Sequence, residues 1–360
     1  MNTEPTSLAK AILLSLLATA SFALVAWTQH ELLGHAEGDE VGPKLDYLSL
    51  HPGEYDTFFL GSSTIFRQVV PSVFDEVMAK SGQATRSYNL GSPGMGGLEA
   101  DHALSRLLEL VEDGVAGDKP TIFYEPRFPG GTLFEELRTT ERTVSWHDFT
   151  RTRLAIQMIA ESELEGREAF DAVVDAGRCF AWKTTNFAQG PRLLRRFAPW
   201  LLEPERSRPY IADSQGYEAL EDSTQDNVIN RGQEFAKDRK GFSGGVHALI
   251  ASHGSPVQPL EDSSTEKAVA RLQAQGAKEV GATLIGLIPP TMTSMSYARA
   301  VADQYHDFYL YNSPRLTPQY FQASGHFDKN HLNREQSEAF TRQLAQDILD
   351  RSPAQGATDE

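Results

Sequence analysis

Short apolar runs alternate with longer stretches of helical periodicity over much of the chain. Between residues 100 and 111, apolar side chains recur at spacings of three and four, as on the buried face of a helix. Similar patterns predict helices over residues 72–80 and 264–275 and a last helix that begins at Asn333, a favourable N-cap residue. The apolar runs are too short for helices and predict strands over residues 55–60, 86–90, 121–124, 282–288 and 308–311.

Strands that are separated by helices indicate a parallel sheet with right-handed crossovers. We therefore predict an α/β fold, a three-layer α/β/α sandwich with a parallel sheet of about five strands, similar to flavodoxin. Residues 130–262 interrupt the alternation with helical stretches (146–161 and 192–202) and long polar connections. We expect this segment to be a helical insertion that covers one end of the sheet.

The N-terminal region contains an uncharged apolar stretch. Residues 11–27 lie at the short end of the roughly 17–25 residues that a membrane-spanning helix needs. Lys10 precedes the stretch and acidic residues follow it, which favours a cytoplasmic N-terminus and a body outside the membrane. We expect residues 1–28 to be a signal anchor or a cleaved signal peptide, and 29–54 to be a polar linker. The main domain is then 55–350, and a disordered tail is expected over 351–360.

Composition excludes several classes of function. The 360 residues carry a net charge of −16, and such an acidic protein would repel the phosphates of a nucleic acid. Cys179 is the only cysteine, so no intramolecular disulfide or cysteine-based zinc site can form. His30 and His35 are five residues apart, whereas a zinc-protease pair needs a spacing of four on one helix face. We predict no metal and no cofactor.

The chemistry centres on Ser63. The first apolar run ends in Gly61-Ser62-Ser63 and a helical pattern follows, a geometry that presents a serine hydroxyl at the carboxyl edge of a parallel sheet. Asp328 and His331 precede the last helix, in a loop that can emerge at the same edge. A carboxylate can orient the imidazole, whose free nitrogen then accepts the serine proton.

We therefore interpret Ser63 as nucleophile, His331 as general base and then acid, and Asp328 as the orienting carboxylate. Each feature also has a purely structural alternative. The Gly-Ser-Ser turn can simply cap a backbone amide, and the Asp328–His331 loop can simply hold the start of the last helix.

Acyl transfer also needs donors for the developing oxyanion. The backbone amides of Ser63 and Gly91 are the natural pair, because Gly91 follows the second strand and should lie beside Ser63. The glycine-rich run over 91–97 has a second interpretation as a phosphate loop. It lacks both the Gly-x-Gly-x-x-Gly spacing and a Lys-Ser/Thr ending, so we rank it lower.

Three segments resemble the first, second and last sequence blocks of the SGNH/GDSL hydrolase superfamily. They are Gly61-Ser62-Ser63, Asn89-Leu90-Gly91 and the run Asp328-Lys329-Asn330-His331-Leu332-Asn333. The resemblance spans residues 55–128 and 280–350 and implies a nucleophile at Ser63, an oxyanion donor at Gly91 and an Asp328–His331 pair. Gly-Ser-Ser in place of Gly-Asp-Ser is similar to membrane-anchored members that act on cell-envelope polymers beside a membrane-bound O-acyltransferase.

The third block of the superfamily, Gly-x-Asn-Asp, is missing. It supplies a side-chain amide to the oxyanion, whereas this chain has Tyr124-Glu125-Pro126-Arg127 after the third strand. Asn89 and Arg127 are candidates for the replacement donor. Arg67 and Arg127 are alternatively candidates for binding an anionic group of the substrate, with surface salt bridges as an equal alternative for each.

Together, these features predict a serine-dependent acyl esterase or O-acyltransferase. The resemblance implies O-acyl substrates, such as O-acetyl groups on a cell-envelope polysaccharide, and a membrane-bound O-acyltransferase as a partner. One alternative is a non-catalytic envelope protein that keeps the fold and binds glycan or the membrane partner. A weaker alternative is a phosphate-binding α/β protein that uses the glycine-rich run.

Overall fold

The computed structural model describes residues 41–130, 140–185, 208–254, 257 and 259–351, together with residues 10, 12–18, 20, 21, 24, 25 and 28. The chain divides into two compact units. One comprises residues 1–39 and 131–207, and the other comprises 40–130 and 208–360. The second, which we call the sheet unit, contains every strand and every predicted site residue.

The expected anchor and tail mostly fall outside the described residues. Within the described part of the chain, no helix combines the length and the apolar character that a membrane span requires. The last helix continues to Arg351, and the expected tail beyond it is outside the description.

The sheet has five parallel strands in the order β2-β1-β3-β4-β5, which confirms the predicted α/β fold. The order reverses between β1 and β3, where doubly wound folds place their ligand sites at the carboxyl ends of the strands. The predicted strands agree with the observed ones to within two residues. The strands are β1 (Thr57–Leu60), β2 (Ser87–Asn89), β3 (Thr121–Tyr124), β4 (Thr283–Ile288) and β5 (Phe308–Leu310).

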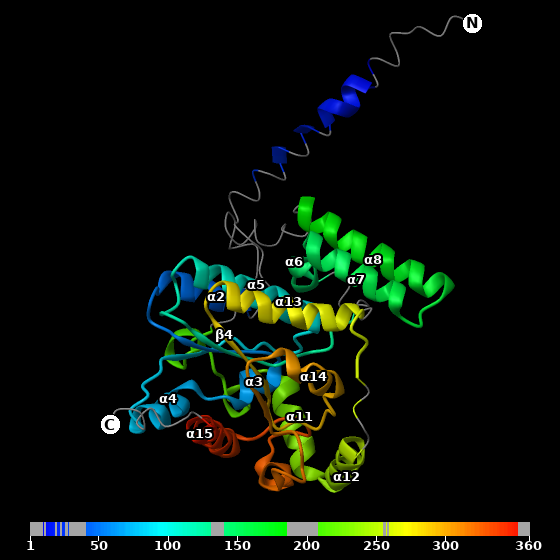
Figure 1. Cartoon of the computed structure of the whole chain (residues 1–360). Helices are drawn as coiled ribbons and strands as arrows, with labels where there is room; N and C mark the ends of the chain where they lie inside the picture. Colours follow the sequence, from blue (N-terminus) through cyan, green and yellow to red (C-terminus); the bar gives the residue numbers. More distant parts are fainter. Residues whose placement is uncertain are drawn as a thin grey trace, which may run out of the picture. The chain divides into compact units, whose positions relative to one another are not determined.

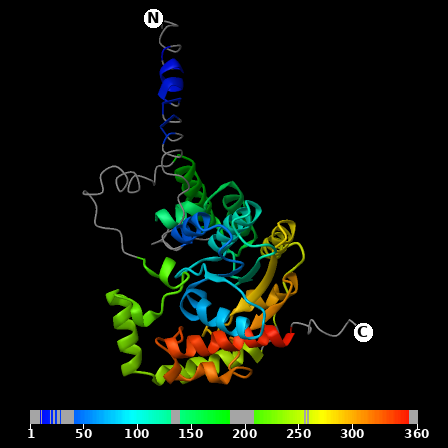
Figure 2. The same cartoon turned by 90° about the vertical axis from the view of Figure 1, so that its left-hand side faces the viewer.

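Helices cover both faces of the sheet, which confirms the three-layer arrangement (Figure 1). Phe58 and Ile122 point to one face, and Phe59 and Phe123 to the other, and all four are buried. Strands buried on both faces appear in sequence as continuous apolar runs, so these runs were recognisable. The first face carries α2 (Val41–Leu50), α5 (Gly97–Glu112) and α13 (Thr265–Glu279), and the second carries α3 (Ser63–Gln68), α4 (Pro71–Lys80) and α15 (Arg334–Arg351). Figure 2 shows the same layers turned by 90°.

The assignment of residues 41–50 to the linker was wrong, because they form α2. Val41, Leu45 and Leu48 lie one turn apart and are buried in the core beside the first face of the sheet. Gly42 and Pro43 gave this stretch the composition of a linker. Proline is nevertheless tolerated in the first turn of a helix, where its missing amide proton has no partner to lose.

The predicted insertion over 130–262 is divided between the two units at residue 207. The helix predicted over 146–161 is present from Phe149 to Glu161. It begins three residues later than predicted because the Asp148 side chain accepts a hydrogen bond from the Arg151 amide and caps its start. The helical stretch predicted over 192–202 lies outside the described residues.

The other unit contains α6 (Glu141–Trp146), α7 (Phe149–Glu161) and α8 (Gly166–Thr185). The sheet unit also contains α10 (Tyr210–Asp213), η4 (Leu220–Asp222), α11 (Asp226–Lys237), α12 (Lys240–Gly254), α14 (Ser296–Ala300), η5 (Ala302–Gln304), η6 (Pro318–Phe321) and η7 (Ala323–Gly325).

Candidate active site

The Gly61-Ser62-Ser63 turn connects β1 to α3 at the carboxyl edge of the sheet. Ser62 caps α3, with its hydroxyl 3.5 Å from the Thr64 amide, and Ser63 is the first residue of that helix. A side chain at Gly61 would collide, since a Cβ atom there would lie 2.6 Å from the Cβ atom of Glu125 and 2.6 Å from Cγ1 of Ile65. The glycine therefore allows the turn to pack directly against the end of β3, and Ser63 remains partly exposed.

Ser63, His331 and Asp328 form one hydrogen-bonded chain. The Ser63 Oγ and His331 Nε2 atoms are 2.8 Å apart, although the residues are 268 positions apart in sequence. On the other side of the ring, Nδ1 lies 2.9 and 3.0 Å from the two carboxylate oxygens of Asp328. The structure therefore brings together the three residues that the sequence singled out, in the order that nucleophilic catalysis requires.

Asp328 is held in its ionised form. Asp328 is 2 % exposed, and its carboxylate accepts hydrogen bonds from the amides of Asn330 and His331 at 2.8 and 2.9 Å and forms an ion pair with Nε of Arg231 at 2.6 Å. Burial alone would raise the pKa of Asp328. The hydrogen bond and the charge of His331, the Asn330 amide and the charge of Arg231 outweigh burial and lower this pKa to about 2.

An ionised Asp328 sets the tautomer of His331. Because a carboxylate only accepts hydrogen bonds, Nδ1 must carry the proton that it donates. The lone pair of Nε2 then faces the Ser63 hydroxyl and can accept its proton.

Arg231 was not predicted to be a site residue. This arginine comes from α11, inside the segment read as an insertion, and its side chain is 50 % exposed. No motif connects it to the Asp328–His331 loop, and only the folded chain brings the two together.

The two additional oxyanion donors predicted around β2 already donate hydrogen bonds inside the protein. The Gly91 amide donates to Oδ1 of Asn89 at 2.8 Å. Nδ2 of Asn89 donates to the carbonyls of Ile65 and Val69 at 2.9 and 2.8 Å, which uses both of its hydrogens. Asn89 is fully buried, and these hydrogen bonds connect the end of β2 to α3. The Ser63 amide, in contrast, has no acceptor among the described residues.

The loop that carries Gly91 is held by a lysine of α2. The fully buried Lys44 of α2 donates a hydrogen bond to the Gly91 carbonyl at 2.7 Å and lies over the ring of Phe66. Neither Lys44 nor its helix was predicted from the sequence.

The two arginines singled out in the sequence have different surroundings. Arg67 is 5 % exposed and binds the carboxylate and the carbonyl of Glu218 at 2.7 and 3.0 Å, so its charge is used within the protein. Arg127 is 30 % exposed, and its Nη1 lies 3.5 Å from the Ser62 hydroxyl, next to the candidate nucleophile.

Glu125 is a site residue to which the sequence analysis gave no role. It is fully buried at the end of β3, where its carboxylate accepts hydrogen bonds from the Ser62 amide at 2.6 Å and the Thr64 hydroxyl at 2.9 Å. Its place directly after β3, beside the point where strand order reverses, is the signal that could have revealed it.

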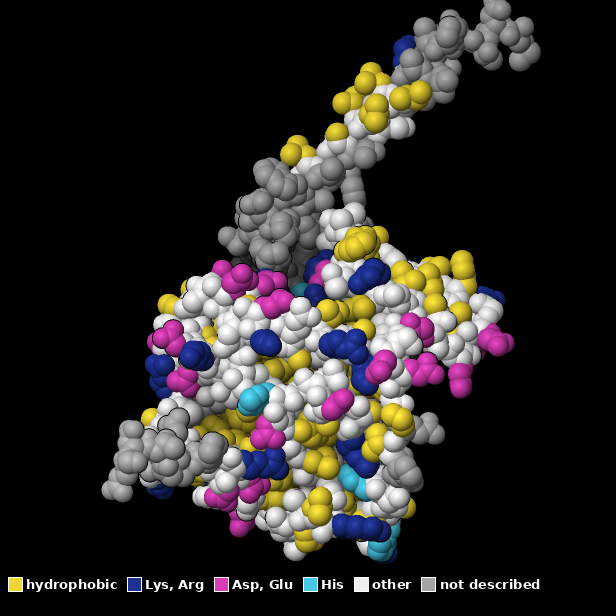
Figure 3. Space-filling model, in the orientation of Figure 1, with side chains coloured by type: hydrophobic (Ala, Val, Ile, Leu, Met, Phe, Trp, Pro, Cys, Tyr) yellow, Lys and Arg dark blue, Asp and Glu magenta, His cyan; other side chains and the backbone are white. Residues whose placement is uncertain are grey.

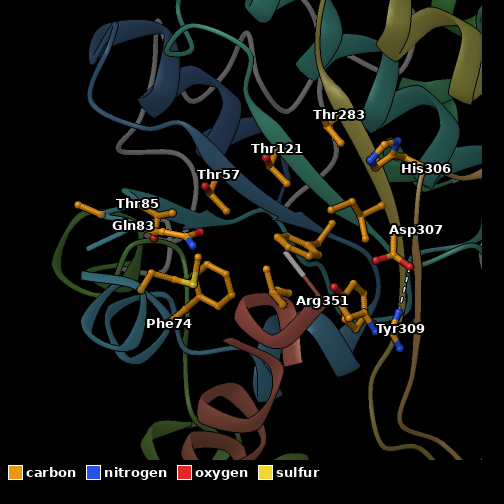
Figure 4. Close-up of a pocket in the computed structure, with 15 residues that line it drawn as sticks. Thr57, Phe74, Gln83, Thr85, Thr121, Thr283, His306, Asp307, Tyr309 and Arg351 are labelled. Carbon is orange, nitrogen blue, oxygen red and sulfur yellow. Dashed lines mark hydrogen bonds and ion pairs between the residues drawn. The ribbon is translucent and has the colours of Figure 1, made fainter. Parts of the chain in front are cut away.

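A pocket of about 440 Å³ lies at the opposite edge of the sheet (Figure 4). Thr57, Thr121 and Thr283, which begin β1, β3 and β4, lie along it, and Asp307 and Arg351 form an ion pair on one side. None of Ser63, Asp328 and His331 lines it. Because doubly wound folds bind ligands at the carboxyl edge, we locate the site by the three hydrogen-bonded residues.

Surface charge and metal-ligating groups were compared over the part of the molecule that the structure describes. On the face that Figure 3 shows, acidic and basic side chains are interspersed. Among the residues that the structure describes, no group of three His, Cys, Asp or Glu side chains could hold a metal ion.

The structure is thus an α/β fold in which Ser63, His331 and Asp328 form a hydrogen-bonded chain at the carboxyl edge of the sheet. Comparison with known proteins gives no matching family model and no matching curated protein.

Proposed function

We propose that this chain is a serine-dependent acyl esterase or O-acyltransferase that acts on O-acyl groups. The single observation that supports this most strongly is the 2.8 Å contact between Ser63 Oγ and His331 Nε2. A serine hydroxyl is a weak nucleophile alone, and an imidazole oriented by a buried carboxylate is the group that activates it.

The proposed reaction has two halves. Ser63 Oγ attacks the acyl carbonyl carbon while His331 Nε2 takes the hydroxyl proton, and the carbonyl electron pair moves to the oxygen. The intermediate collapses, and the departing alkoxide takes the proton from His331, which leaves an acyl-enzyme. Water or a sugar hydroxyl then attacks the acyl-enzyme with the same proton transfers and gives hydrolysis or transfer, respectively.

The substrate and location in this proposal come from sequence. An uncharged apolar stretch with Lys10 before it and acidic residues after it favours an extracytoplasmic domain beside the membrane. The SGNH resemblance then supports an O-acetylated cell-envelope polysaccharide as substrate and a membrane-bound O-acyltransferase as partner.

Turnover of an aryl acetate by the full-length protein in detergent tests this chemistry. We expect Ser63→Ala to lower kcat by at least about 10³-fold, since removing a triad nucleophile typically costs up to about 10⁶-fold. Equal turnover by both proteins would remove Ser63 from the mechanism. Addition of an O-acetyl acceptor glycan then distinguishes transfer, which acetylates the glycan, from hydrolysis, which releases acetate.

A non-catalytic binding protein is the second candidate, and one observation favours it. The Gly91 amide and the Asn89 side chain both donate hydrogen bonds inside the protein, which leaves the oxyanion with few donors. Labelling with a fluorophosphonate separates the two functions, because only an activated serine reacts. Labelling that is abolished by Ser63→Ala excludes the binding protein, and no labelling of the wild type supports it.

A further inference from the structure

The oxyanion of the proposed reaction needs a donor besides the Ser63 amide. The other predicted donors are already used. The Gly91 amide binds the Asn89 side chain and Nδ2 of Asn89 binds the Ile65 and Val69 carbonyls, so both would have to break these bonds to act. Acyl-transfer sites rely on donors that are already oriented, because reorienting a donor during the reaction reduces its benefit.

Arg127 is placed to supply that donor. It follows β3 at the carboxyl edge, and β3 pairs with β1, which leads into the turn before Ser63. Its Nη1 contacts the Ser62 hydroxyl at 3.5 Å, the Glu125 carboxylate at 3.3 Å and the Met295 sulfur at 3.8 Å. In the described part of the chain, Nη2 and Nε of Arg127 have no acceptor, and the side chain is 30 % exposed.

Glu125 connects the Arg127 guanidinium to the Gly61-Ser62-Ser63 turn. Its buried carboxylate accepts hydrogen bonds from the Ser62 amide, the Thr64 hydroxyl and Nη1 of Arg127. A buried carboxylate is stable only when it is paired and hydrogen-bonded, so Glu125 restrains both the turn and the arginine. The cation is thereby held at a constant position relative to Ser63.

We propose that Arg127 is a catalytic residue that donates to the oxyanion, in place of the side-chain amide that the missing third sequence block would supply. This inference rests on the proposed serine chemistry. As the Ser63 oxygen bonds to the acyl carbon, the carbonyl electron pair moves onto the oxygen, and the unused N–H groups of Arg127 bind the negative charge. The charge disappears when the carbonyl re-forms and the alkoxide leaves with the proton from His331.

The test compares aryl acetate kinetics of the full-length wild type with Arg127→Gln, Arg127→Lys and Arg127→Ala. We expect Arg127→Gln to lower kcat by about 10²–10³-fold with KM within about three-fold, the pattern for loss of one oxyanion donor. Arg127→Lys keeps a cation beside Glu125 and should lower kcat less than Arg127→Gln does. Added guanidinium ion should partly restore the kcat of Arg127→Ala. Arg342→Gln is the matched control, because Arg342 is a half-exposed, ion-paired arginine on α15 and should leave kcat unchanged.

An arylboronic acid gives a readout without turnover. It forms a tetrahedral adduct with an activated serine, with one oxygen in the place of the oxyanion. We expect Arg127→Gln to weaken its binding by at least about ten-fold, a loss expected only if the arginine contacts that oxygen.

Two results would overturn the proposal. One is an Arg127→Gln enzyme with wild-type kcat and boronate affinity. The other is a loss confined to KM and seen only with acidic substrates, such as an acetylated hexuronate compared with an acetylated neutral sugar, which would make Arg127 a binding residue for a substrate anion. Neither result would contradict the proposed serine chemistry. That proposal fails only if the wild type shows no Ser63-dependent turnover or fluorophosphonate labelling.

Discussion

Among the single residues of the site, Asp328 binds the side chains of both His331 and Arg231. Its carboxylate faces His331 Nδ1 with both oxygens, and one of these oxygens also binds Arg231 at 2.6 Å. With a pKa near 2, Asp328 is ionised throughout the range in which an esterase operates. Asp328 therefore presents a full negative charge to His331 over that range.

Arg231 is expected to keep Asp328 ionised in acid. Its charge is one of the causes that lower the pKa of Asp328, so Arg231→Gln should raise that pKa toward its ordinary value. A carboxyl whose pKa is lowered on folding stabilises the fold above its unfolded pKa, and this stability is lost as the pH falls through the folded pKa, here about 2. Arg231→Gln should therefore be less stable than the wild type at neutral pH, and the difference should shrink as the medium becomes strongly acidic, which urea unfolding at several pH values measures.

Arg342→Gln again provides the control, with 52 % exposure against 50 % for Arg231. A stability difference between Arg231→Gln and the wild type that does not change with pH would show that Arg231 does not act through the charge of Asp328. Only a structural role of the ion pair would then remain.

At the scale of elements, the site depends on how closely β2, α3 and β3 approach one another. Gly91 lies against the backbone of α3, where a Cβ atom would be 2.3 Å from the Phe66 nitrogen and 2.7 Å from its Cα. Backbone atoms cannot move aside as a flexible side chain can. Asn89 connects the same two segments through the Ile65 and Val69 carbonyls, so a displacement at Gly91 would also strain those bonds.

Gly91→Ala is expected to destabilise the fold and to misplace Ser63. We expect a loss of about 1–3 kcal/mol in the free energy of unfolding, the usual cost of overpacking a buried site, with a fall in kcat because α3 carries the nucleophile. Urea unfolding and aryl acetate kinetics measure the two effects. Gly96→Ala in the same loop is the control, since nothing lies within 4 Å of its Cβ position and its φ is −83°. Similar losses in both variants would contradict the steric argument.

At the scale of the whole molecule, the sequence predicted what depends on local pattern and on strand order. The five strands were visible as apolar runs, and a parallel sheet places the ends of β1 and of the strand before the last helix at one edge. That is why Ser63 and His331 could be paired in advance. Glu125, Lys44 and Arg231 were missed because their contacts come from the packing of separate segments, which no spacing records.

Residues 131–207 are expected to be dispensable for the serine chemistry. All five strands lie in the sheet unit, as do the three hydrogen-bonded site residues and the groups that hold them. A flexible Gly-Ser linker of about twenty residues, with a typical reach of about 25 Å, can replace the segment in the otherwise complete chain.

We expect the shortened protein to unfold in one cooperative transition and to hydrolyse aryl acetate with a kcat within about ten-fold of the full chain, since that substrate needs only the triad and oxyanion donors. The same replacement carrying Ser63→Ala is the control for background hydrolysis. Loss of Ser63-dependent turnover in a folded protein would mean that residues 131–207 complete the site. Turnover of the small ester could also persist while acetylated polysaccharide is no longer processed. Residues 131–207 would then contribute to binding the polymer, because an aryl ester is too small to need that contact.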